Sequence, residues 1–312
     1  MSATAQPPFS PLRRAYRFVN RPYYWYRPSQ LALRLRAHPS EDGSPQLLRA
    51  AWGSKLYCWP DPLGMAVART GIYDLTVAET LARLADPGET AVDAGANVGF
   101  MTNLLAHAVG AQGRVLSFEP HPLIFETLAR NVERWRTLED LDVVEVRQAA
   151  VSASRGTLPL GVDPETFAQN KGTASLERAD ATHTTEVATV RLDEELSGPI
   201  GVVKLDVEMH ELAALQGAEA LLSKKLIRDI VFEEHEQPPT AVTAVLEARG
   251  YTVLGVRQGL TGPILSAPAE AYSMRLWDPP AMLATIDPQR ARARLAPRGY
   301  RTLRSGRNGH AG

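Results

Sequence analysis

Two acids and two glycines with close spacing could form the binding site for a nucleotide-like ligand. The first acid and both glycines stand in one loop, as Asp93-Ala-Gly95-Ala-Asn97-Val-Gly99. The loop follows a short apolar run, residues 90–92, and precedes residues 101–109, which have helical periodicity. This order predicts a strand, a glycine loop and a helix, the arrangement with which a doubly wound α/β fold opens its ligand pocket. Glycine lets the backbone approach a ligand closely because it has no Cβ.

The second acid is Glu119, which ends the predicted strand 114–118 and lies 26 residues after Asp93. An acid at this place can accept hydrogen bonds from both hydroxyls of a ribose. The loop reads D-x-G-x-N-x-G and not the dinucleotide pattern G-x-G-x-x-G. Asp93 would repel a pyrophosphate but suits an ammonium group. S-adenosylmethionine (SAM) has a ribose, an ammonium and a sulfonium but no phosphate, so the pattern favours SAM; an ordinary tight turn in a βα unit is the alternative.

The composition is that of a globular protein with an ample core: 312 residues, enough for one large domain or two small ones. No apolar run approaches the roughly 20 residues that cross a bilayer, and the basic N-terminus lacks the apolar region of a secretory signal. Cys58 is the only cysteine, which excludes an intrachain disulfide and a thiolate metal cluster. These features favour a cytoplasmic location.

Charge is distributed unevenly along the chain. Residues 1–40 and residues 288–312 each carry seven arginines and no acid, whereas residues 41–287 carry all 35 acids and only 20 basic residues. The ends could contact an anionic membrane, nucleic acid or partner, but we expect them to fold back on the acidic body or to stay solvated. The predicted organisation has three parts. They are an Arg- and aromatic-rich segment (1–45), a methyltransferase domain (46–287) with an N-terminal cap (46–88), and an Arg-rich, disordered tail (288–312).

Between these ends, predicted strands and helices alternate, which is typical of a mostly parallel sheet. Residues 161–185 are polar and irregular, and we expect them to form a lid. The expected class is α/β, a class I (Rossmann-like) methyltransferase fold with a seven-stranded, mostly parallel sheet and an antiparallel terminal hairpin. The predicted strands are 90–93, 114–118, 143–151, an edge strand 186–192, 200–207, 227–232 and the pair 251–256 and 263–267.

Several motifs are together very similar to the FkbM-type SAM-dependent methyltransferase family. The resemblance covers about residues 71–265 and implies SAM as the methyl donor and a hydroxyl of a sugar, polyketide or other metabolite as the acceptor. The motifs are the glycine loop, Phe118-Glu119-Pro120, Leu192-Asp193, and Lys204-Leu-Asp206-Val-Glu208-x-His210-Glu211 with Leu215-x-Gly217.

The resemblance also implies roles for single residues. Glu119 would hold the ribose, Ala150 would lie near the adenine, and Asp206 and Glu208 would flank the transferred methyl group. The methionine end of SAM would meet Asp93, Gly95, Asn97 and Gly99. The chain departs from the family at Met209, where the family usually has a glycine that permits a positive φ or leaves room for substrate.

Methyl transfer to an alcohol is an in-line displacement in which the alcohol must also lose a proton, so a nearby base assists it. Histidine is favoured by its pKa, although both candidate histidines could equally be solvent-facing. A divalent cation held by Asp206 and Glu208 would be an alternative, but two acids alone do not support a metal site. The candidate bases follow the fourth and fifth parallel strands: Asp206, Glu208 and His210, then Glu233, Glu234 and His235.

The sequence therefore predicts a SAM-dependent O-methyltransferase acting on a small-molecule or glycan hydroxyl. An RNA methyltransferase that uses the Arg-rich ends is one alternative, although the motif for methylating base amino groups (Asn/Asp-Pro-Pro-aromatic) is replaced by Asp206-Val-Glu208. Nucleic acid is therefore not the expected partner. A SAM-fold binding module without catalysis, suggested by Met209, is the other alternative. The oligomeric state is left open.

Overall fold

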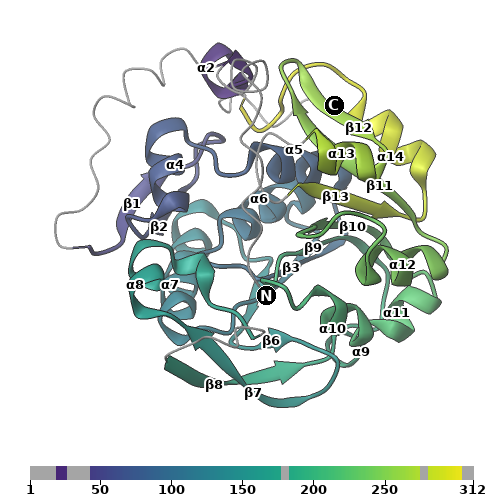
Figure 1. Cartoon of the computed structure of the whole chain (residues 1–312). Helices are drawn as coiled ribbons and strands as arrows, with labels where there is room; N and C mark the ends of the chain where they lie inside the picture. Colours follow the sequence, from purple (N-terminus) through teal and green to yellow (C-terminus); the bar gives the residue numbers. More distant parts are fainter. Residues whose placement is uncertain (1–18, 27–42, 177–182, 275–279, 304–312) are drawn as a thin grey trace.

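A computed structural model describes residues 19–26, 43–176, 183–274 and 280–303, which form a central sheet covered by helices on both faces (Figure 1). The sheet has eight strands in the order β12-β11-β13-β10-β9-β3-β4-β5. Strands β5, β4, β3, β9 and β10 run parallel, and β13, β11 and β12 add antiparallel pairs. In chain order the strands are β3 (Thr90–Ala94), β4 (Arg114–Phe118), β5 (Val144–Arg147), β9 (Ile200–Leu205), β10 (Ile227–Glu233), β11 (Thr252–Gly259), β12 (Gly262–Ser266) and β13 (Ala281–Thr285).

Strand β9 shows why the sheet is buried on both faces. All six of its residues are buried, and successive side chains point to opposite faces of a strand. Val202 accordingly packs into one apolar cluster and Val203 into the other. The first cluster takes in helices α4 (Pro62–Thr70), α5 (Leu75–Leu84), α6 (Phe100–Val109), α7 (Pro122–Glu139) and α14 (Pro288–Leu295). The second takes in α10 (Glu211–Gln216), α11 (Glu219–Ser223), α12 (Ala241–Ala248) and α13 (Pro268–Ser273).

The predicted class I methyltransferase fold is confirmed, but the sheet has one strand more than expected. The missed strand, β13, inserts between β10 and β11 and pairs antiparallel with both. Its five residues are buried, and two of them are alanines, which have weak strand propensity. A run this short does not identify itself as a strand until its neighbours in the sheet are known.

Two further strand predictions are corrected. The expected strand 143–151 is divided: β5 stays in the central sheet, and β6 (Ala150–Val151) joins a separate three-stranded sheet. Strand β8 (His183–Val190), expected at the edge of the main sheet, forms the middle of this second sheet with β7 (Gly156–Val162). The small sheet thereby places β6 beside the carboxyl ends of the main strands, since β6 begins three residues after β5 ends.

The part that precedes the glycine loop is anchored on α7. The hairpin β1 (Gln46–Arg49) and β2 (Lys55–Cys58) is bonded to this helix, because Trp135 Nε1 donates to the Lys55 carbonyl (2.8 Å) and Asn131 Nδ2 to the Tyr57 carbonyl (2.9 Å). Farther upstream, α2 (Pro22–Tyr26) is a short helix. The sequence also predicts a short helix over residues 31–35, but these residues lie outside the described part of the chain. None of the helices in the described ranges has the length and apolarity to cross a bilayer.

The expectation of a disordered C-terminal tail is wrong for residues 288–303. Helix α14 packs on α5, and Leu295, Tyr300 and Leu303 are buried. The tail folds back because the acidic body offers partners for its arginines: Arg290 pairs with Asp86 and Asp229, and Arg294 also pairs with Asp86. Residues 304–312 lie outside the described part of the chain.

A buried ion pair on α5 holds the end of this tail. Arg83 and Glu79 are almost completely buried and bonded to each other at 2.7 Å. Arg83 also donates to the carbonyls of Leu295, Pro297 and Gly299, while Glu79 accepts from the Thr302 backbone N–H and hydroxyl. The charges of the pair are thus satisfied by backbone groups of the tail.

Candidate active site

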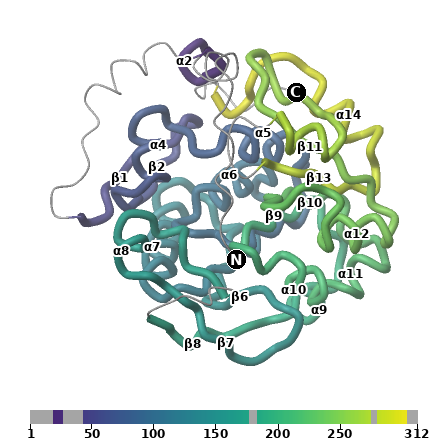
Figure 2. The backbone as a smooth tube through the Cα atoms, in the orientation of Figure 1, coloured from purple at the N-terminus to yellow at the C-terminus, as the bar shows by residue number. Residues whose placement is uncertain are grey.

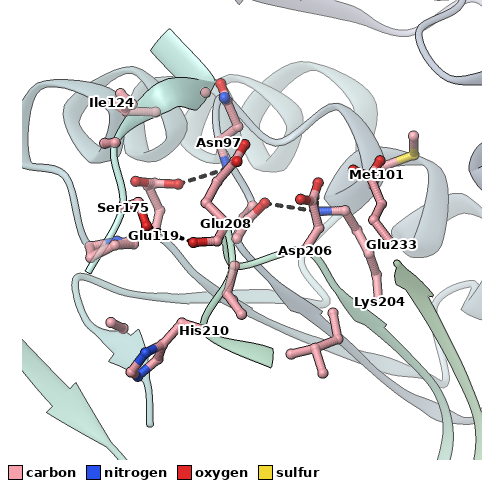
Figure 3. A pocket seen from close by; sticks show the side chains of 18 of the residues that line it. Asn97, Met101, Glu119, Ile124, Ser175, Lys204, Asp206, Glu208, His210 and Glu233 are labelled. Atoms are coloured by element: carbon pink, nitrogen blue, oxygen red, sulfur yellow. Dashed lines mark hydrogen bonds and ion pairs between the residues drawn. The ribbon is translucent and has the colours of Figure 1, made fainter. Parts of the chain in front are cut away.

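A cavity opens at the carboxyl ends of β3, β4, β9 and β10, the usual place of ligands in an open α/β sheet (Figure 3). Its walls come from the glycine loop, the residues after β4 and β9, strand β6, the start of α5, and the segment after β7. Among the residues that line it are Gly95, Asn97, Glu119, Ala150, Asp206 and Glu208. With His210, seven of the predicted site residues thus surround one space.

Lys204 fixes the position of the glycine loop. The Lys204 ammonium donates to the Gly95 carbonyl (2.8 Å) and lies 3.3 Å from Asp93 Oδ1 and 3.2 Å from Asp206 Oδ2. Burial alone would lower the pKa of this lysine, but Asp206 and Asp93 raise it above its ordinary value. The lysine that interrupts the apolar strand is therefore a paired, charged residue that ties β3 to β9.

Gly95 cannot carry a side chain. Its φ is +79°, and a Cβ at this position would lie 1.7 Å from the carbonyl oxygen of Asp206. The backbone of the loop therefore packs directly against the backbone that follows β9, which only a glycine permits.

Asp93 and Gly99 do not reach the cavity. Asp93 is fully buried beneath the loop, where Thr102 Oγ1 donates to its Oδ2 (2.7 Å). Gly99, at φ +90°, leaves room for Leu128 and Trp135, since a Cβ would lie within 2.8 Å of both side chains. Neither residue is among the cavity's lining residues. Both of them shape the loop from outside the cavity.

Glu119 points into the cavity from the end of β4 (Figure 3). Its carboxylate accepts from the backbone N–H groups of Asn97 and His121, both at 2.9 Å. Burial raises the pKa of Glu119 to about 7, against the lowering effect of these two hydrogen bonds. The remaining lone pairs of the carboxylate can accept from a diol. Beside it, an apolar wall suits a flat aromatic group; it consists of Ile124, Ala149, Ala150, Val151 and Leu160.

Four more carboxyl groups line the same cavity. Asp206 and Glu208 follow β9, Glu233 ends β10, and Asp74 caps the N-terminus of α5 by accepting from the Val77 N–H (3.0 Å). Burial, then the neighbouring Asp206, raises the pKa of Glu208 to about 8 and that of Glu233 to about 10. Burial raises the pKa of Asp74 as well. The cluster thus combines a lysine-paired aspartate with two acids, Glu208 and Glu233, whose pKa values lie above neutral pH.

The site predicted from the sequence does not include Asp74 or its neighbour Tyr73. In the sequence, both residues belong to a segment that predicts only a turn before an amphipathic helix. The left-handed backbone of Asp74 (φ +36°) and its capping hydrogen bond account for an aspartate here on structural grounds alone. Only the packing of α5 against the sheet brings its carboxyl group to the cavity.

The two candidate histidines are not brought together. His210 lines the cavity and is buried, with Nε2 2.9 Å from Ser152 Oγ, and Figure 3 shows its ring apart from the carboxyl groups of Asp206 and Glu233. His235 lies outside this cavity and lines a second one. Glu234 is buried and accepts from Thr240 Oγ1 (2.6 Å) at the start of α12. The acids are therefore better placed than the histidines for chemistry in the first cavity.

Part of the predicted lid covers the cavity. Helix α8 (Pro164–Gln169) and the 3₁₀ turn η1 (Lys171–Thr173) lie within the expected segment, and residues 170–172 and 174–176 line the cavity. Ser175 Oγ donates to the Glu208 carbonyl (2.6 Å), and the Lys171 ammonium donates to the Phe167 carbonyl (2.8 Å). The lid is thus bonded to the loop that carries the acids. Residues 177–182 lie outside the described ranges.

Met209 adopts the backbone conformation that its place in the family pattern suggested. Its φ is +75°, directly after Glu208 at +50°. The Met209 side chain is 54% exposed and does not line either cavity, so it strains the backbone without filling the site.

We expect Met209→Gly to stabilise the protein by up to about 1 kcal/mol. A left-handed conformation costs a residue with a Cβ about 1–2 kcal/mol, and the extra chain entropy of glycine offsets about 0.5–1 kcal/mol of that gain. Urea unfolding measures the difference. Met209→Ala is the matched control, because it shortens the side chain and keeps the strain; equal stabilisation by both variants would contradict the backbone argument.

In the part of the chain that the structure describes, no group of three or more His, Cys, Asp or Glu side chains is arranged to hold a metal ion. Asp206, one of the two proposed metal ligands, is instead engaged by Lys204.

Comparisons with known proteins agree with these features. The family model described as "Methyltransferase FkbM domain" matches residues 93–253. The chain is 29% identical over 195 residues to methyltransferase sdnD of Sordaria araneosa, covering 52% of this chain and 73% of that protein. It is 27% identical over 197 residues to methyltransferase 1 of Beauveria bassiana, covering 56% and 76%.

Solved structures show weaker likeness. A crystal structure of a methyltransferase FkbM from Methylobacillus flagellatus superposes with a TM-score of 0.42 at 14% identity, over 70% of this chain and 52% of that one. The chain therefore spans about half the length of that protein. A SAM-dependent O-methyltransferase from Thermotoga maritima gives a TM-score of 0.41 at 14% identity, over 78% and 77%.

Proposed function

Because the chain belongs to the FkbM methyltransferase family and is a SAM-dependent methyltransferase, we propose that it methylates a hydroxyl oxygen of a small-molecule or glycan acceptor. The observation that carries the proposal is the cluster of half-buried carboxyl groups that line the same cavity as Glu119. A hydroxyl acceptor must lose its proton, and carboxylates beside it can take that proton.

The residues of the cavity fit SAM. The glycine loop lines the cavity at Gly95 and Asn97, Glu119 offers a carboxylate for the ribose hydroxyls, and the apolar wall at Ala150 suits the adenine. We assign the methionine end of SAM to the glycine loop at Gly95 and Asn97. Asp93 acts on this loop indirectly, because it pairs with Lys204, which bonds the Gly95 carbonyl. SAM, when bound, supplies an electrophilic methyl group on a sulfonium sulfur.

Within this scheme Glu208 is the proposed base. Its pKa of about 8 lies near a working pH, whereas Glu233, at about 10, keeps its proton and can donate a hydrogen bond to the acceptor. Asp206 is held by Lys204 and orients the acceptor hydroxyl. The lid segment that lines the cavity excludes water from the reacting groups. We give His210 a structural role beside Ser152.

The rate of methyl transfer should rise with pH through about 8. The base must be unprotonated, and burial raises the pKa of Glu208, so the active form accumulates only as pH increases past that value. The measurement is kcat/KM between mildly acidic and alkaline pH. Glu208→Gln should remove this rise and lower the rate by roughly 100-fold, whereas a variant that keeps the full pH dependence would assign the base elsewhere.

The acceptor class is tested by a screen with labelled SAM and hydroxylated compounds, each paired with the same compound in which the hydroxyl is blocked or replaced by an amine. We expect label in the hydroxyl member alone, as an ether stable to mild base. Transfer to the amine member would overturn the O-methylation proposal and leave the methyltransferase assignment intact.

Observations on the described residues weigh against the two alternatives. Of the C-terminal arginines, Arg290 and Arg294 pair with acids of the protein itself, which removes much of the basis for contact with RNA phosphates. Met209 suggested a binding module without catalysis, but its side chain leaves the cavity open.

A further inference from the structure

A second cavity adjoins the first and shares part of its wall. The residues common to both are Tyr73, Asp74, Asn170, Glu208 and Glu233. The rest of the second cavity is formed by α2 and its preceding residues, by α4, and by the segment 256–258 of β11 together with the start of β13. In the tube view, α2 lies above α4 and the β11–β13 end of the sheet (Figure 2).

Resting on the proposed function, we propose that this second cavity binds the methyl acceptor and that the acceptor carries an oxyanion, a carboxylate or a phosphate, at the end opposite its reactive hydroxyl. The oxyanion would meet Arg21, Arg69 and Arg257, which line the cavity. The hydroxyl would reach the acids that the two cavities share.

Residues 20–26 of the N-terminal segment are fixed in this wall by specific contacts. Asn20 is completely buried, and it exchanges two hydrogen bonds with Gln258: Asn20 Nδ2 donates to the Gln258 carbonyl (2.7 Å), and Gln258 Nε2 donates to the Asn20 carbonyl (2.8 Å). Tyr26 also packs edge-on against Tyr300 of the C-terminal segment, with ring centroids 5.8 Å apart. Because Asn20 is fixed on β11, Arg21 and the tyrosines after it are held at the cavity.

Charge is divided along the cavity. The acids lie where it joins the first cavity. Burial raises the pKa of Glu208 to about 8 and that of Glu233 to about 10, so these two groups are largely uncharged at neutral pH, and burial raises the pKa of Asp74 as well. The arginines stay charged. The outer part of the cavity is therefore cationic, which favours an anionic ligand there.

Two of the arginines retain donors for a ligand. Arg257 Nη2 bonds Glu270 at 3.0 Å, and its Nη1 has no partner within the described ranges. Arg69 is exposed, and no described side chain pairs with it. A guanidinium matches the two oxygens of a carboxylate or phosphate. Between the two ends, Tyr23, Tyr24 and Met65 offer flat or apolar surface for a ring.

The test compares the binding of matched neutral and anionic hydroxylated probes. The sets are glucose against glucuronate and glucose phosphate, and tyrosol against hydroxyphenylacetate. Each is titrated calorimetrically into the full chain saturated with S-adenosylhomocysteine. The anionic members should bind about tenfold tighter than the neutral ones. The two glucose derivatives separate a carboxylate preference from a phosphate preference.

Variants connect this preference to the cavity. Arg69→Gln, at an exposed position, should remove most of the tenfold preference and leave binding of the neutral probe unchanged; Arg257→Gln should do the same. Arg292→Gln is the matched control, because Arg292 is exposed on α14 and lines neither cavity. Three outcomes overturn the inference. The first is equal binding of neutral and anionic probes, and the second is a preference for anionic probes that survives both variants. The third is no binding of any probe at millimolar concentration while SAM binds normally. If SAM does not bind either, the proposed function itself fails.

Discussion

A chain that ends after Asp287 is expected not to fold stably. It loses α14 and the buried side chains of Leu295, Tyr300 and Leu303, and each such side chain contributes about 1.5–3 kcal/mol on burial. The truncation also removes most of the hydrogen-bond partners of Glu79 and Arg83, which leaves this ion pair with unsatisfied donors and acceptors. Together these losses approach the whole stability of a typical domain, about 5–15 kcal/mol.

Circular dichroism and thermal unfolding of the shortened chain measure this loss. A chain that ends after Leu303 is the matched control, since it keeps every tail contact in the described part of the structure, and it should melt close to the full-length protein. Should the chain ending after Asp287 melt at nearly the same temperature as the control, the packing of the tail would be unimportant.

The consequence reaches the active site through α5. This helix carries Glu79 and Arg83 along its length and Asp74 at its N-terminus, where the carboxyl group lines both cavities. Glu79→Gln is a milder version of the truncation. It keeps the shape and leaves Arg83 buried without its counter-charge, a change that typically costs about 3–5 kcal/mol.

Asp206→Asn is expected to lower the rate of methyl transfer by roughly 100-fold while SAM affinity changes little. The carboxylate of Asp206 lies at the end of β9, in the cavity, with Lys204 holding it at 3.2 Å. Asparagine keeps the shape but removes the charge that orients the acceptor hydroxyl. Lys204 retains Asp93 and the Gly95 carbonyl, so the glycine loop should stay in place.

Single-turnover kinetics with labelled SAM and calorimetry of SAM binding separate the two effects. Glu233→Gln is the matched control: this acid holds its proton at neutral pH, its pKa being raised to about 10 chiefly by burial, so the neutral amide replaces a neutral group and the rate should fall far less. Full activity of Asp206→Asn on a verified acceptor would remove Asp206 from the mechanism. A collapse of SAM affinity would assign it to the loop instead.

The arrangement of the core was accessible from the sequence because the signals are local. A buried parallel strand is a continuous apolar run, as at 200–207, and a glycine loop between a strand and a helix is identified by residue type and spacing alone. Lys204 follows the same logic, because a charge in such a run must be paired; the structure pairs it with Asp93 and Asp206, the acids at the ends of β3 and β9.

What only the tertiary structure decided depends on residues distant in the chain. Asp74 and Glu233 are 159 positions apart, and their carboxyl groups share a cavity only because α5 packs beside β10. The C-terminal tail likewise becomes ordered through contacts with distant residues. Its composition is that of a solvated segment, but Asp86 and Asp229 pair with its arginines and Glu79 accepts hydrogen bonds from its backbone. A sequence pattern reports what a segment favours in water, whereas burial and pairing are set by surfaces that distant segments form together.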